Sequence, residues 1–181
     1  MDTIYNTAQD EFSIEDENGK SRLIYAYFGL AIYFAQCLEE TLSILLWTNK
    51  VFKNKVKTNR EVNEIIDDSE ISKKPMGILL NEVKRVYELS DDQILSSQSI
   101  LNERNYLVHR YFKINVQKFY SSQGQLEMLK YFCDFIGKSQ HIDEELKFHY
   151  KIYTDKLGLT EEEITAIMED MIKQEVQKEA H

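Results

Sequence analysis

Residues that interrupt helices are scarce in this sequence. Its 181 residues include one proline and six glycines, the two residue types that cost most in a helix interior. No segment shows the alternation of apolar and polar residues that is typical of a strand, except weakly over Phe112–Tyr120. With 43% hydrophobic residues the chain can bury a sizeable core. We therefore expect an all-α protein, an up-and-down bundle of about four to five long helices.

Cysteines are few, and the sequence shows no pattern typical of a signal segment or of a cluster of metal ligands. Cys37 and Cys133 follow no metal-ligand spacing, which predicts buried free thiols, no metal and no other cofactor. The first 18 residues contain neither a basic segment nor an apolar run, so they do not read as a signal peptide. The longest apolar run, Leu23–Trp47, contains two glutamates mid-length, which favours a core helix over a membrane span. The sequence thus predicts a cytoplasmic protein without membrane contact.

Positive charge is in deficit, with a formal net charge of −9. This balance argues against a protein that coats nucleic acid non-specifically, because phosphate contacts need cations. A small basic site on an acidic body is still compatible with it. One local basic run contains Lys53, Lys55 and Lys57. It is interpreted as a solvated loop or, alternatively, as a contact for an RNA backbone.

Apolar residues at three- and four-residue steps set the expected order of elements. The first long helix carries aromatic residues on more than one face, so we expect it to be central or shared with a second subunit. We expect a polar N-terminal arm over 1–20 that orders only on a partner, followed by helices over 22–50, 60–68 and 75–89, the second capped by Thr58 or Asn59. A Ser90–Gln93 capping box would open a helix over 91–114. The next helix, over 125–157, would be weak near 137–140 and end at Gly158, and a last helix would run from a Thr160–Glu163 capping box through 178. The bundle would occupy 21–158, and 159–181 would belong to it or bind a partner.

The stretch Arg104-Asn105-Tyr106-Leu107-Val108-His109-Arg110-Tyr111 is the most specific part of the chain. On a helix of 100° per residue, a stripe through Ile94, Leu101, Val108 and Phe112 is expected to be buried. Asn105 falls in that stripe, with Arg104 and His109 on either side. An unpaired buried amide costs about 1–3 kcal/mol, so the polar trio suggests a cleft or a second copy of the helix. The alternatives are a packing histidine and an arginine paired with Glu103 or an acid of the first helix.

The pattern of Arg104, Asn105, three residues and His109 resembles the signature of the HEPN family of helical ribonucleases, and Tyr111 extends it to the form found in HEPN toxins. The resemblance implies metal-independent RNA cleavage, in which the 2′-hydroxyl attacks the adjacent phosphate to give a 2′,3′-cyclic phosphate. It also implies a HEPN-like fold and a catalytic site shared across a two-fold homodimer. His109 would transfer protons, Arg104 would stabilise charge on the phosphate, and Asn105 would orient either group.

The same resemblance suggests supporting residues and partners. An acid of the first helix, Glu39 or Glu40, would lie near the site, and the candidates for RNA-backbone contacts are Arg110, Lys113, Lys53, Lys55 and Lys57. We expect a toxin or anti-phage effector, with RNA as substrate and a nucleotidyltransferase-type antitoxin or another defence-system protein as partner. Such an antitoxin would modify Tyr111, which is otherwise a packing tyrosine. The alternative function is a non-catalytic HEPN-type dimerisation module.

Overall fold

The structure, a computed structural model, describes residues 2–54, 58, 60–61, 64, 71, 73–157, 166, 169 and 173. Every regular element within these residues is helical, which confirms the all-α prediction. The elements are α1 (Asp2–Ile14), α2 (Glu17–Lys53), α5 (Met76–Val86), α6 (Asp91–His109), α7 (Tyr111–Asn115), the 3₁₀ helix η1 (Val116–Tyr120) and α8 (Ser122–Leu157). The expected Gly158 cap and second capping box, most of the helices over 60–68 and 160–178, and Lys55 and Lys57 lie outside the described residues.

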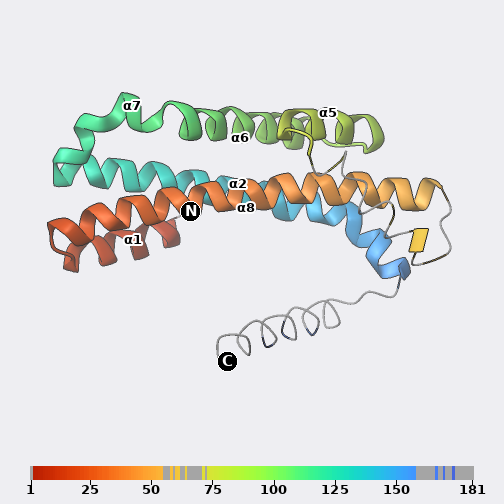
Figure 1. The fold of residues 1–181 in the computed structure, drawn as a ribbon, viewed down its shortest axis with the longest axis horizontal. Helices are drawn as coiled ribbons and strands as arrows, with labels where there is room; N and C mark the ends of the chain where they lie inside the picture. The colour runs from red at the N-terminus through yellow and green to blue at the C-terminus, as the bar shows by residue number, and fades with distance from the viewer. Residues whose placement is uncertain are drawn as a thin grey trace.

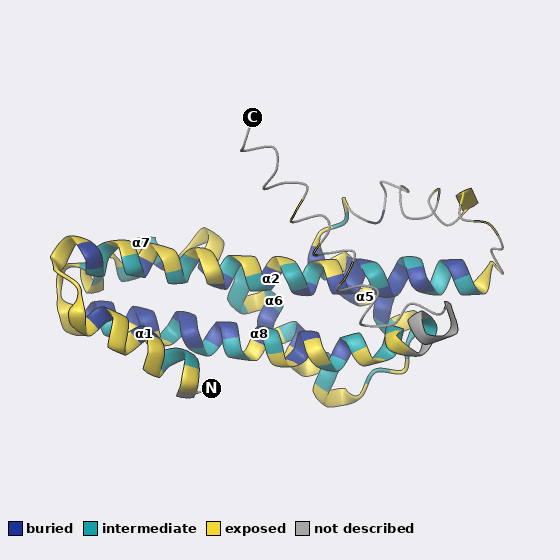
Figure 2. Cartoon of the chain, turned by 90° about the horizontal axis from the view of Figure 1, so that it is seen from below, coloured by how far each residue is buried: buried dark blue, intermediate teal, exposed yellow. Residues whose placement is uncertain are grey.

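The three longest helices lie side by side, with α6 running back along α2 and α8 (Figure 1). α1 packs on α8, and α5 packs on α2 near the end of the molecule where α6 begins. Buried residues follow the sides on which the long helices face one another (Figure 2). The core is built from aliphatic side chains of these helices and from Phe132 and Phe135 of α8. This arrangement fixes which face of α6 points inward.

The N-terminal residues do not form the expected arm. They fold into α1, which buries Ala8 and Phe12 in this chain's own core. Its few apolar residues recur at helical steps among mostly polar neighbours, a pattern that predicts a helix only weakly. The carboxylate of Asp16 then accepts a hydrogen bond from the amide of Gly19 at 2.7 Å. This cap starts α2 earlier than the expected beginning at Arg22.

α2 is a central helix, and the most extensive packing between two elements is its contact with α8. Asn54 ends it, with its amide donating to the carbonyl of Lys50 at 3.0 Å. By length and composition alone α2 could cross a membrane, and 44% of its apolar window is buried inside the structure. The core helix of a soluble protein meets the same criterion, so length and composition do not distinguish the two. α2 therefore supplies the long apolar surface on which the other helices assemble.

The sequence predicts the N-terminal ends of α5 and α6 correctly. Pro75 directly precedes α5, which ends at Val86 rather than at the expected Leu89. The Ser90–Gln93 capping box is confirmed: the Gln93 amide donates to Ser90 Oγ at 3.1 Å, and the Ser90 amide donates to Gln93 Oε1 at 3.1 Å. These two bonds fix the start, and so the phase, of the helix that carries the motif.

The C-terminal end of the motif helix was predicted wrongly. α6 ends at His109, because Arg110 adopts φ −134° and ψ −26°, away from regular helix geometry. The break turns two aromatic rings into the bundle. Tyr111 lies 4.9 Å from the ring of Phe132, and Phe112 lies 5.0 Å from the ring of Phe28. The weak strand candidate that begins at Phe112 is helical, forming α7 and η1.

The buried face of α6 also differs from the expected one. Its buried residues are Ser97, Ile100 and Leu107. The expected stripe through Leu101 and Val108 lies at the edge of the helix, where Val108 is 43% exposed. The true stripe is rotated by about a quarter of a turn, at 100° per residue. Asn105 and His109 therefore face farther from the core than the sequence pattern indicated, whereas Arg104 lies closer to it and is half-buried.

α8 is one continuous helix and does not weaken over 137–140 as expected. It follows a tight turn in which Ser121 Oγ accepts a hydrogen bond from the Gly124 amide at 3.1 Å. A Cβ atom at Gly124 would collide with the backbone of Lys118. Glycine is required at this position because the end of η1 approaches the first turn of α8 so closely.

Candidate functional site

The motif residues line a cavity of about 590 Å³ on the outward side of α6. Its lining consists of Asn102, Asn105, Tyr106, His109 and Arg110. Steps of three and four residues place these side chains on one face of the helix. The lining combines two amides, a phenol, an imidazole and a guanidinium, and none of its described residues carries a carboxylate. An anionic ligand could therefore enter this cavity although the chain carries net negative charge.

Arg104 lies beside this cavity, on the side of α6 that faces α2. Its Nη1 donates to Asn105 Oδ1 at 3.2 Å, and its Nη2 lies 3.8 Å from Glu39 Oε2. The Arg104 and Glu39 side chains are 29% and 27% exposed, so water still reaches both. Of the two expected acids, the structure brings Glu39 to the motif, whereas Glu40 is exposed elsewhere on α2. Glu39 and Asn105 together orient the guanidinium.

His109 occupies the last residue of α6 and is exposed. Among the described residues, no hydrogen bond or ion pair engages its ring, so both ring nitrogens are available to a ligand. Asn105 lies one helical turn before it on the same face. The structure thus brings Asn105 and His109 into one cavity, with Arg104 linked to them through the Asn105 amide.

Tyr111 does not lie in the cavity. It is 3% exposed, and its ring stacks on Tyr131 with 5.0 Å between centroids. Burial, together with neighbouring tyrosines, raises the pKa of the Tyr111 phenol above its ordinary value. On an unbroken helix of 100° per residue Tyr111 would lie close to Arg104 around the axis, but the helix breaks at Arg110. The structure therefore favours the packing tyrosine over the surface-exposed modification site.

The expected RNA-backbone residues fall into separate groups. Arg110 lines the cavity, and Lys113 is exposed on α7 shortly after it. Lys53 lies near the other end of α2, about 20 Å from Glu39 at 1.5 Å per residue. There it lines a different cavity of about 240 Å³ together with Arg85. The structure therefore brings Arg110 and Lys113 towards the motif and keeps Lys53 away from it.

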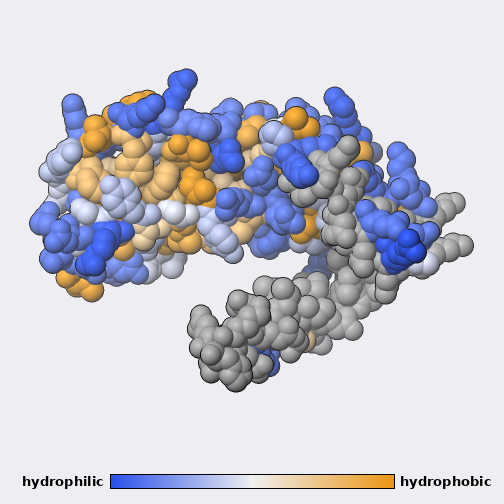
Figure 3. Space-filling view, in the orientation of Figure 1, coloured by the Kyte–Doolittle hydropathy of each residue, from blue (hydrophilic) through white to orange (hydrophobic). Residues whose placement is uncertain are grey.

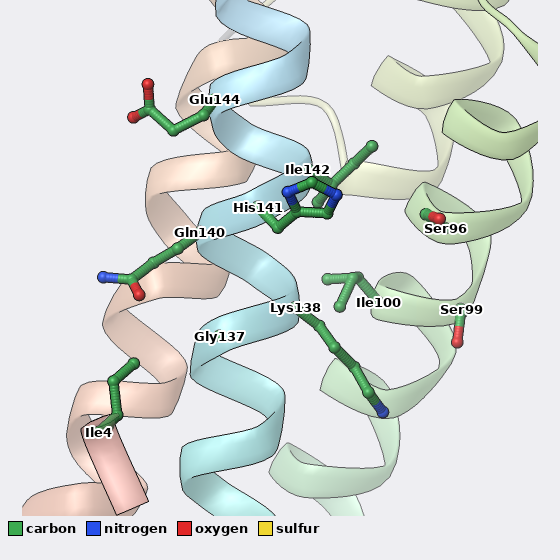
Figure 4. A pocket seen from close by; sticks show the side chains of 10 residues that line it. All are labelled: Ile4, Ser96, Ser99, Ile100, Gly137, Lys138, Gln140, His141, Ile142 and Glu144. Atoms are coloured by element: carbon green, nitrogen blue, oxygen red, sulfur yellow. The ribbon is translucent and has the colours of Figure 1, made fainter. Parts of the chain in front are cut away.

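A second cavity, about 840 Å³, lies over α8 between α1 and α6, and its described lining contains none of the predicted catalytic residues (Figure 4). Two of its polar side chains are already engaged. Lys138 Nζ donates to Glu103 Oε1 at 3.0 Å, and His141 Nε2 lies 3.3 Å from Glu145 Oε1. Nothing in this lining pairs a free general base with a cation. The smaller cavity on α6 is therefore the stronger candidate for chemistry.

Metal-ligand clusters are absent from the part of the chain that the structure describes, where no group of three or more His, Cys, Asp or Glu side chains could hold an ion. Cys133 is buried, and burial raises the pKa of its thiol to about 12. Cys37 is half-buried. Both thiols are free, and the buried Cys133 thiol is not an activated nucleophile.

An exposed apolar face lies on the N-terminal half of α2. It consists of Tyr25, Gly29 and Tyr33, one helical turn apart. Figure 3 shows apolar side chains gathered over this half of the bundle. Each tyrosine is 56% exposed, and a Cβ atom added at Gly29 would meet open space. Contiguous exposed apolar surface of this kind marks an interaction site.

Two residues of the cavity were not singled out from the sequence. Asn102 lies two turns and Tyr106 about one turn before the end of α6, at the helical spacing that shares a face with His109. No known family model, curated protein or solved structure matches this chain. The geometry of the α6 cavity is therefore the basis for a functional proposal.

Proposed function

We propose that this protein is a metal-independent endoribonuclease of the HEPN type that works as a two-fold homodimer in the cytoplasm. The observation that supports it is the shared cavity of Asn105 and His109, with Arg104 hydrogen-bonded to Asn105 and paired with Glu39. A titratable imidazole, an oriented cation and an amide are the groups that RNA cleavage without a metal requires. These are also the residues on which the resemblance to HEPN ribonucleases rests.

In the proposed reaction the substrate's 2′-oxygen forms a bond to phosphorus while the bond from phosphorus to the 5′-oxygen breaks. One His109 takes the 2′-hydroxyl proton, and a second His109 gives a proton to the leaving 5′-oxygen. The products are a 2′,3′-cyclic phosphate and a 5′-hydroxyl. Arg104 stabilises the charge on the phosphate oxygens through its planar fork of donors. Attack and departure occur on opposite sides of phosphorus, so one imidazole cannot serve both.

The need for two imidazoles connects the chemistry to assembly. Each chain contributes one His109 on an outward face, and the N-terminal half of α2 exposes the apolar face of Tyr25, Gly29 and Tyr33. A two-fold axis beside this face would bring both copies of His109 into one cleft. The open space at Gly29 would let the partner helix approach closely. Light scattering at micromolar concentration should therefore give a dimer mass.

The cellular role proposed is that of a toxin or anti-phage effector, held in check by a nucleotidyltransferase-type antitoxin or another defence-system protein. The burial of Tyr111 bears on the form of this control. A nucleotide can be attached to Tyr111 only if the phenol leaves its stack with Tyr131, so occlusion by a bound partner is the simpler route. Mass spectrometry of the protein co-expressed with its neighbouring gene separates the two: an added nucleotide on Tyr111 supports modification, and its absence with activity still suppressed supports occlusion.

The decisive experiment substitutes the motif residues. His109→Ala and Arg104→Ala should each reduce RNA cleavage by about 100-fold or more, while His141→Ala, another exposed histidine, should leave it unchanged. Cleavage should persist in EDTA, with cyclic phosphate ends detected by mass spectrometry. Full cleavage by both purified motif variants, with contaminating nuclease excluded, would refute the assignment. Loss of cleavage in EDTA would refute only its metal-independent part.

The alternative function is a non-catalytic dimerisation module. The exposed apolar face favours it as well, because that face would be buried in a dimer whether or not RNA is cleaved. A stable dimer that cleaves no RNA, and whose mass is unchanged in His109→Ala, would establish this alternative in place of the ribonuclease.

A further inference from the structure

Tyr106 lines the α6 cavity, and the proposed chemistry gives it no role. Its ring is held in place from the other side. The Asn115 Nδ2 group donates to Tyr106 Oη at 2.9 Å and to the carbonyl of Tyr111 at 2.9 Å. The rings of Tyr111 and Tyr131 meet it edge-on, at 5.7 Å and 6.2 Å between centroids. An aromatic ring fixed in this way can present a surface to the cavity without losing side-chain entropy on binding.

Two amides accompany this ring in the cavity. Asn105 Oδ1 accepts from Arg104, which turns the Asn105 NH₂ group away from that bond. Asn102 is exposed one turn earlier, and its Oδ1 lies 3.5 Å from Gln98 Nε2, a long contact that a ligand can replace. Side-chain amides offer both a donor and an acceptor, the pair that matches the edge of a nucleobase.

The lining is ordered along the helix. Asn102 and His109 are about 10 Å apart along the axis of α6, at 1.5 Å per residue, with Tyr106 between them. The end of the cavity at Asn102, where a nucleobase would bind, is thus separate from the end that holds His109 and Arg110. A volume of about 590 Å³ falls within the range of small-molecule sites. One nucleotide could therefore bind with its base at Asn102 and its phosphate near His109.

We propose that Asn102 and Tyr106 form a base-binding subsite, so that the substrate is single-stranded RNA with an unpaired base beside the cleaved phosphate. This inference rests on the proposed ribonuclease function and names its substrate. In an RNA duplex the bases are stacked on one another and their edges are engaged, so the face of Tyr106 cannot reach them. In a single strand the base can stack on Tyr106 while Asn102 bonds to its edge.

Kinetics on the full-length protein test the subsite. Stacking of a base on an aromatic side chain is worth about 1–3 kcal/mol, so Tyr106→Leu should raise KM for single-stranded RNA by about 5-fold or more with a smaller change in kcat. Tyr106→Phe, which keeps the ring, should stay within about 3-fold of the wild type. Asn102→Ala should change the base preference at the cleavage position, and Ser96→Ala, at an exposed position of α6 outside the cavity, should not. Thermal melting of each variant identifies any rise in KM that reflects unfolding.

A second measurement does not depend on turnover. RNA carrying 5-iodouridine is irradiated with the full-length His109→Ala protein, and the cross-linked peptide is mapped by mass spectrometry. A cross-link at Tyr106 supports the subsite, and cross-links confined to the region of Lys53 and Arg85 overturn it. Equal cleavage of duplex and single strand, with Tyr106→Leu as active as wild type, overturns the subsite but leaves the ribonuclease standing. A wild-type protein that neither binds nor cleaves RNA overturns both.

Discussion

The two halves of α2 have similar apolar composition but very different surroundings. The C-terminal half is packed between α5 and α8 and is buried on several faces, at Thr41, Leu42, Ser43, Leu45, Leu46, Thr48 and Val51. The N-terminal half is buried along one stripe and leaves Tyr25 and Tyr33 exposed. Apolar composition thus predicts that a surface will be covered, but not by what. The C-terminal half is covered by this chain, and the N-terminal half, in the proposed dimer, by a second copy.

The largest loss of stability should come from the crowded half. Leu42→Ala removes a fully buried side chain and should lower the free energy of unfolding by about 2–5 kcal/mol. Leu30→Ala, in the open half where Leu30 is 39% exposed, should cost under about 1 kcal/mol. Chemical denaturation at one fixed protein concentration measures both. Equal losses would show that the open half is covered as tightly as the crowded one.

Self-association should depend on the open half alone. Gly29→Glu places a charge where the partner helix would approach and should convert the dimer to a monomer at micromolar concentration. RNA cleavage should fall with it, because the second His109 is lost. Ile78→Glu is the matched control, since Ile78 is an exposed apolar residue on α5. Light scattering gives the masses, and an unchanged dimer in Gly29→Glu would exclude this face as the interface.

A smaller effect is expected at the ion pair that joins Glu39, near the middle of α2, to Arg104 of α6. Glu39→Gln should change the unfolding free energy by less than about 1 kcal/mol, because the pair is partly solvated. It should lower kcat several-fold, since Arg104 then keeps only Asn105 as an orienting partner. The neighbouring Glu40→Gln should change neither quantity. Equal kcat values for the two variants would remove Glu39 from the site.

The smallest effect concerns pH and the aromatic cluster that supports the motif. Burial raises the pKa of Tyr131 to about 12 from 10. The unfolded chain therefore ionises this phenol first, so its contribution to stability is complete below pH 10 and is lost as pH rises towards 12. Tyr131→Phe should flatten the fall of the unfolding midpoint across that window. Tyr120→Phe, at an 82% exposed position, should leave the slope unchanged.

Local signals in the sequence were sufficient for much of the fold. The scarcity of proline and glycine indicated an all-α chain, and the Ser90–Gln93 pair located the start of α6 to the residue. The end of α6 could not be read in the same way, because it is set by Tyr111 and Phe112 packing on other helices rather than by a local cap. The pattern for α1 is weaker, because the buried Ala8 and Phe12 are two of a few apolar residues in a mostly polar segment.

The candidate site shows the same division. The residue types and spacing of the motif selected Asn105 and His109, which do share a cavity. Choosing between Glu39 and Glu40 required the relative rotation of α2 and α6, which sequence patterns on separate helices do not define. Tyr106 was overlooked because its role depends on Asn115, a residue beyond the helix break. Long-range packing decides these points, and a pattern within one segment cannot contain them.

All described lining residues of the cavity come from α6 and its C-cap residue Arg110, which has a consequence for protein engineering. A site assembled from several loops must be transplanted as a three-dimensional unit, but residues 102–110 could be copied onto the exposed face of another helical scaffold as a single cassette. Such a graft would carry Asn102, Tyr106 and His109 in register. It would leave behind Glu39 of α2 and Asn115 of α7, and a recipient helix would need substitutes for both before the cassette could hold its side chains as this protein does.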